Sequence, residues 1–84
     1  ESKLSYEAQK EQARKARKLE KQVAECEERI SKLEQQIQEL ENKMATPEGA
    51  SDMQLYEQHR QLKQQVASEE EEWERLSLEL EELK

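Results

Sequence analysis

The 84-residue chain has very little of what a globular core requires. It contains one Gly, one Pro, one Cys and one Trp, with no Phe, and only 32% of its residues are hydrophobic. A chain of this length and composition cannot build a sphere-like core. The single Cys excludes an internal disulfide framework and favours a reducing compartment. No apolar run approaches the length of a membrane span, so we expect a cytoplasmic location and no membrane partner.

What the chain has in abundance is charge and helix-forming residues. Charged residues make up 42% of the sequence, and Glu, Gln, Lys, Leu, Ala and Arg dominate it. These residues favour helices. A composition with this much charge is also found in disordered chains. A folded chain is expected only where the few apolar residues recur periodically. Here they do recur periodically, which is typical of long helices that pack against each other.

The helix-breaking residues gather in residues 45–51. Pro47 lacks an N–H and cannot extend the helix before it. Gly49 is expected to adopt a positive φ. Ser51 followed by Gln54 has the spacing of a capping box. A turn is therefore predicted here.

Two helices follow from this turn. We expect one over about 5–44 and another over about 52–83, within a single domain that spans 1–84. Neither helix has another element to pack on, so they should form an antiparallel two-helix coiled-coil hairpin, an all-α fold. Because the chain begins at Glu1 without a Met, we expect it to be a fragment of a larger protein.

The apolar residues of the two segments also match each other in register. In both segments they alternate steps of four and three, as in a heptad seam. Opposite residues of an antiparallel hairpin have numbers with a constant sum, and here nine pairs add to 99. The pairs are Met44–Leu55, Leu40–His59, Ile37–Leu62, Leu33–Val66, Ile30–Glu69, Cys26–Trp73, Val23–Leu76, Leu19–Leu80 and Ala16–Leu83. The alternative, a parallel homodimer kinked at Pro47, does not require the two seams to mirror each other.

The sequence gives no sign of a catalytic or metal site. Cys26 and His59 are the only soft ligands, and this register separates them by about 21 Å along the helices, too far for a shared metal or a nucleophile pair. We therefore expect no catalytic, metal or cofactor-binding residue and no enzymatic activity. Cys26 is interpreted as a small residue opposite Trp73. His59 is interpreted as a polar residue that fixes register, with a pH-sensing imidazole as the alternative.

Acidic residues are concentrated in the second helix. Glu69 occupies a seam position, where its stem should pack on Ile30 while its carboxylate reaches water or Arg29. A notch for a partner is the alternative. The run Glu69–Glu72, with Glu74, is interpreted as a solvated face, and the alternative is an acidic docking surface.

Basic residues are concentrated near the start of the chain. Residues 1–24 hold seven basic and four acidic side chains, whereas the remainder has a net charge of −10. The candidate nucleic-acid-binding residues are Lys10, Arg14, Lys15, Arg17, Lys18 and Lys21. Lys10, Arg14, Arg17 or Lys18, and Lys21 recur at steps of three or four, and such an outward stripe suits phosphate contacts.

Two further points bear on this basic stripe. The cations could instead neutralise the acidic end of the second helix, at Glu79, Glu81 and Glu82. No aromatic residue lies between the cations, so sequence-specific single-strand recognition is not expected.

Several segments together resemble one family. These are the opening Lys3-Leu4-Ser5-Tyr6-Glu7, the long Glu/Leu-rich helix, the Pro-containing turn and the segment Glu72-Trp73-Glu74-Arg75-Leu76. The chain resembles the C-terminal domain of the ABC-F ATPases, particularly the Uup-type members. It departs from many relatives in lacking a Pro near residues 12–16.

The resemblance implies a cytoplasmic parent with two ATP-binding cassettes, which uses ATP and Mg²⁺ and works on the translating ribosome. It implies that this C-terminal hairpin is an accessory arm beside those cassettes, and nucleic-acid binding is attributed to the arm in Uup-like members. We therefore expect a non-catalytic arm that contacts DNA or the backbone of ribosomal or transfer RNA. The alternative is a purely structural spacer or protein-docking coiled coil. The chain alone is expected to be a monomeric hairpin or a weak dimer.

Overall fold

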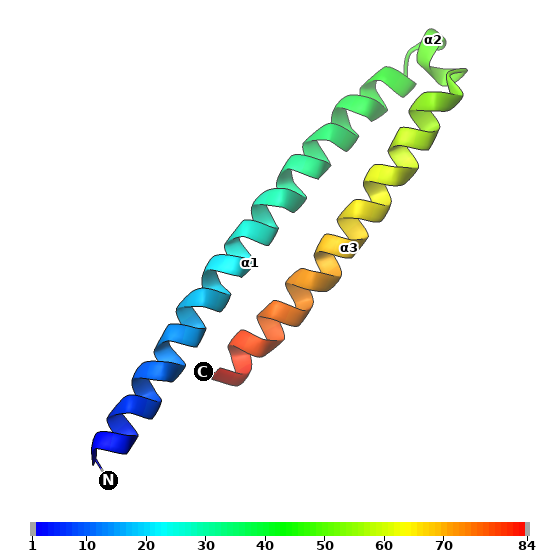
Figure 1. Cartoon of the computed structure of the whole chain (residues 1–84). Helices are drawn as coiled ribbons and strands as arrows, with labels where there is room; N and C mark the ends of the chain where they lie inside the picture. The colour runs from blue at the N-terminus through cyan, green and yellow to red at the C-terminus, as the bar shows by residue number, and fades with distance from the viewer. Residues whose placement is uncertain (1, 84) are drawn as a thin grey trace.

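The computed structural model describes the backbone of residues 2–83 and the side chains of residues 5–83. This part of the chain contains three helices and no strand: α1 (Ser2–Met44), α2 (Pro47–Ala50) and α3 (Met53–Leu83). α1 and α3 lie side by side and run in opposite directions, joined at one end by α2 (Figure 1). The molecule is a rod of 71 × 14 × 14 Å. The all-α prediction is confirmed.

The core is the single line of contact between α1 and α3. All eighteen residues of the nine pairs predicted from the sequence are buried or half-buried, whereas almost every other described position is exposed. The most deeply buried side chains are Cys26, Leu76, Leu40, Ile37 and Val66. Each turn of α1 that lies beside α3 therefore buries its apolar side only against the facing turn of that helix.

Polar contacts near the middle of the rod accompany this apolar seam. The Cys26 thiol donates a hydrogen bond to the backbone oxygen of Glu69, with 3.1 Å between sulfur and oxygen. Burial, and then the charge of Glu69, raise the pKa of this thiol. The Nε1 of Trp73 donates to a carboxylate oxygen of Glu27 at 3.0 Å. Cys26 is fully buried, as expected of a small residue in the seam, and Trp73 is half-buried with its indole N–H bonded to an exposed carboxylate.

Both polar residues of the seam have partners on α1. The Glu69 carboxylate forms an ion pair with Arg29, so of the two expected environments, water or Arg29, the structure gives the second. His59 is 23% exposed, and its Nε2 lies 3.0 Å from a carboxylate oxygen of Glu41. The seam therefore accommodates both residues by directing their polar ends to its edge.

The connection between the long helices differs from the expected turn. Thr46, not Ser51, begins the first new helix, since its side chain accepts from the Gly49 N–H at 3.0 Å. Pro47 occupies the first turn of α2, where its missing N–H has no cost. The start of α3 is capped by Asp52, whose carboxylate accepts from the Gln54 N–H at 3.0 Å. The capping box expected from Ser51 is therefore wrong: Ser51 closes the end of α2 instead.

The expected positive φ at Gly49 is also wrong, because no described glycine has one. Gly49 is buried inside α2, and what requires glycine there is close approach to α1. A Cβ on Gly49 would lie 1.8 Å from the backbone oxygen of Lys43. A backbone oxygen at the end of a long helix cannot move aside cheaply, so the tight connection depends on a missing side chain.

Gly49→Ala is therefore expected to destabilise the hairpin by about 1–3 kcal/mol, the usual cost of overpacking. Chemical denaturation followed by helical circular dichroism measures the change. Ala50→Ser, at an exposed position of the same short helix, is the matched control and should alter stability little. Equal stability of Gly49→Ala and the unaltered chain would show that the connection does not pack as described.

Candidate functional site

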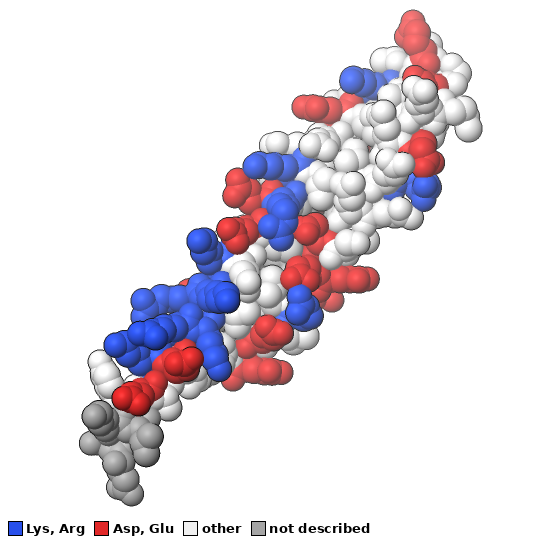
Figure 2. All heavy atoms as spheres, viewed as in Figure 1, with Lys and Arg blue, Asp and Glu red and all other residues white. Residues whose placement is uncertain are grey.

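The six basic residues singled out from the sequence all lie on the half of α1 that leads to the open end of the hairpin. Each of the six side chains is exposed. In the space-filling view the densest group of Lys and Arg on the visible face lies over this lower part of α1 (Figure 2). The rest of that face carries mixed charges. The cluster expected from the sequence therefore exists as a surface feature.

The structure separates these six residues into two sets. Lys15 and Lys18 line a hollow beside the end of α3, together with Glu79 and Glu82. The other four are Lys10, Arg14, Arg17 and Lys21. A helix turns about 100° per residue, which places these four within about 60° of one another, on the side of α1 opposite α3. We call these four residues the outer basic face.

The two sets differ in what lies beside them. Lys15 and Lys18 are placed to offset the acidic end of α3, as one interpretation expects. The outer basic face points away from α3 and cannot do so.

The four cations of the outer basic face are not neutralised by carboxylates in the described part of the chain. Among the ion pairs of the described residues, none involves Lys10, Arg14, Arg17 or Lys21. Arginines elsewhere are engaged: Arg60 binds Glu57 and Arg75 binds Glu72 within single turns of α3. The outer basic face is thus a row of solvated cations, about 16 Å long from Lys10 to Lys21.

The acidic run of α3 is, by comparison, partly neutralised. Glu69 is paired with Arg29, and Glu72 with Arg75. The hydrogen bond from Arg75 is the main cause of the lowered pKa of Glu72. Arg75 also lies 3.9 Å from Glu79. The run is therefore a face of local ion pairs and solvated carboxylates, in agreement with the simpler interpretation.

The outer basic face lies partly on an overhang of α1. α1 has 43 residues and α3 has 31, so α1 continues past the end of its partner, as Figure 1 shows. Gln12 closes the end of α3 by donating from Nε2 to the Leu83 backbone oxygen. Sequence reasoning missed Gln12, although it lies seven residues before Leu19, where the heptad places another seam position. Only the residues before Gln12 extend beyond that contact.

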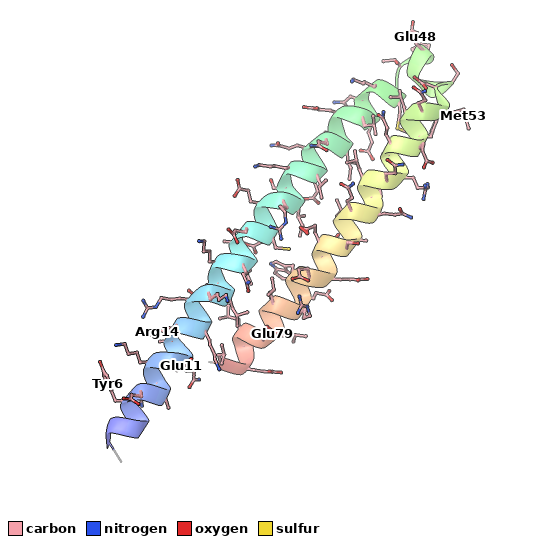
Figure 3. The ribbon with its side chains drawn as sticks, in the orientation of Figure 1. Tyr6, Glu11, Arg14, Glu48, Met53 and Glu79 are labelled. Carbon is pink, nitrogen blue, oxygen red and sulfur yellow. The ribbon has the colours of Figure 1, made fainter. Side chains whose placement is uncertain are left out.

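Figure 3 shows how the side chains of the open end are arranged. Tyr6 and Arg14 extend from the side of α1 that faces away from α3, while Glu79 lies on α3. Tyr6 is 63% exposed. The open end therefore presents cations and an aromatic ring on its outer side and carboxylates on the side of α3.

No helix in the described part of the chain combines the length and the apolar character needed to cross a membrane. No curated protein and no solved structure matches the chain significantly. A family model, described as the ABC transporter C-terminal domain, matches residues 3–78. That match covers all of α1 but its first residue, all of α2 and most of α3, and it includes all six basic residues. The chain therefore belongs to the ABC transporter C-terminal domain family.

Proposed function

We propose that this chain is the non-catalytic accessory arm of an ABC-F ATPase, and that its outer basic face binds the phosphate backbone of nucleic acid. The family match supports an accessory domain of an ABC protein. The resemblance of the opening segment and the Trp-containing segment to Uup-type members carries the finer assignment. The parent would then be cytoplasmic and would hold ATP and Mg²⁺ in cassettes outside this chain.

The long, narrow shape of the chain suits an arm that extends from its parent protein toward a binding partner. We propose that α1 and α3 form an antiparallel coiled coil in the register of the nine pairs, because their buried positions follow that register throughout. Such a rod is stiff and 71 Å long. It carries the outer basic face near the end that holds the N-terminus, where a preceding domain would join (Figure 1).

The single observation that carries the nucleic-acid proposal is the row of four solvated cations. Phosphate contacts need only positively charged side chains at helical spacing and no pocket. The cations are not used by the fold, since they face away from α3 and take part in no described ion pair. The net charge of −7 repels nucleic acid at longer range, so the binding should be weak and strongly dependent on salt.

The first test is the salt dependence of binding to a fluorescently labelled oligonucleotide. With four phosphate contacts, log Kobs should fall against log[salt] with a slope between about −2.8, for a single strand, and about −3.6, for a duplex. The triple variant Arg14→Glu, Arg17→Glu, Lys21→Glu should lose binding at low salt, because three of the four contacts become repulsive. Fluorescence anisotropy measures both quantities.

The matched control is Lys32→Glu, Arg60→Glu, Lys63→Glu, which changes the net charge equally but away from the outer basic face. It should retain most of the binding. Equal losses in the two triple variants would mean that only net charge matters. No binding by the unaltered chain would favour the second candidate, a structural spacer, for which the length of the rod is the supporting observation.

Lys15 and Lys18 should behave differently from the outer basic face. Because they lie beside Glu79 and Glu82, Lys15→Glu with Lys18→Glu places like charges around one hollow. We expect a lower melting temperature at low salt, with the loss largely reversed at high salt by screening. Thermal denaturation at two salt concentrations measures this. The variant Arg14→Glu with Arg17→Glu is the comparison and should melt like the unaltered chain; a similar fall in both variants would contradict the division.

A further inference from the structure

Tyr6 continues the outer basic face toward the N-terminus. It precedes Lys10 by four residues, and Lys10, Arg14, Arg17 and Lys21 follow at steps of four, three and four. Residues at such steps share one side of a helix. Figure 3 shows Tyr6 and Arg14 on the same outer side of α1. The ring is thus about 6 Å along the axis from the first cation of the row.

The exposure of this ring follows from the geometry of the hairpin. Tyr6 lies beyond the contact that Gln12 makes with the last turn of α3, so that helix cannot cover it. It is 63% exposed, whereas the other tyrosine, Tyr56, is 42% exposed and donates its hydroxyl to the Ala50 oxygen at 2.9 Å. Tyr56 has a structural role in the connection. No described hydrogen bond involves the Tyr6 hydroxyl.

A flat aromatic face beside a row of cations matches one ligand chemistry in particular. Proteins that bind single strands combine cations that follow the backbone with aromatic rings on which unpaired bases stack. A duplex hides the faces of its bases, so it would use only the cations. The acidic residues Glu7 and Glu11 flank this row, since they precede Lys10 and Arg14 by three positions each, but neither takes part in a described ion pair.

We propose that Tyr6 is a stacking platform for an unpaired base and that the outer basic face binds a single-stranded segment of nucleic acid. This inference rests on the proposed function and adds the form of the ligand to it. The aromatic residue stands at the end of the cation row and not between the cations, so the proposal agrees with the expectation that no sequence is recognised. One aromatic ring can stack on any base. The site should therefore bind a strand with unpaired bases more tightly than a strand without bases, and it should not prefer any sequence.

The test uses the 84-residue chain and two fluorescent oligonucleotides of equal length, one with bases and one composed of abasic nucleotides. Both carry the same phosphates, so the ratio of their affinities isolates the contribution of the bases. The unaltered chain should bind the strand with bases about five-fold more tightly or better. Tyr6→Leu should remove this preference while leaving the affinity for the abasic strand unchanged. Tyr6→Phe should retain the preference, because it keeps the ring.

Tyr56→Leu is the matched control, since it removes the other tyrosine at the far end of the rod, and its ratio should equal that of the unaltered chain. Equal affinities of the unaltered chain for the two strands would overturn the stacking role while leaving the phosphate contacts in place. If the Tyr6→Leu variant still preferred the strand with bases, the stacking role of Tyr6 would also be overturned and the phosphate contacts would remain. Binding to neither strand would overturn the proposed function, and the role of Tyr6 with it.

Discussion

The structure depends on one constraint: α1 and α3 have only each other to pack against. A rod 14 Å across has no interior beyond the line where the two helices meet. Every seam residue must therefore face an opposite residue of suitable size and polarity, and a change of register would disturb all nine pairs together. This is why two polar residues in the seam, His59 and Glu69, each need a partner at its edge.

The same constraint determines where function can lie. Side chains that face the seam are committed to packing, and part of the remaining surface carries opposite charges that pair within single turns. The outer basic face is different because its four cations take part in no described ion pair and point away from α3. It lies mainly on the part of α1 that packs on α3, and only Lys10 precedes the contact of Gln12 with the last turn of α3 and so lies on the overhang. The overhang is thus a consequence of two helices of unequal length.

The parts of this arrangement that repeat were predictable from the sequence, and the parts that occur once were not. The seam involves eighteen residues that obey one spacing rule, so the pattern holds even where His59 or Glu69 breaks it. The connection offers no such repetition. Gly49 is required by the distance to a single backbone oxygen, and Asp52 competes with Ser51 for one cap, so both depend on local geometry. The basic residues could be recognised as a cluster, but their division into Lys15 and Lys18 beside α3 and four outer cations needed the position of the facing helix.

The central claim is that α1 packs in this register on α3 of the same chain, and crosslinking tests it most directly. Gln22 and Glu79 line the same hollow, so cysteines at these two positions, with Cys26→Ala, should be joined by a short bismaleimide within one chain. Cysteines at Gln22 and Gln58 should not be joined, because Gln58 lies about 30 Å further along α3. The expected product is an internally linked monomer on a denaturing gel. Linked dimers from the first pair, or internal links from the second, would contradict the hairpin and its register.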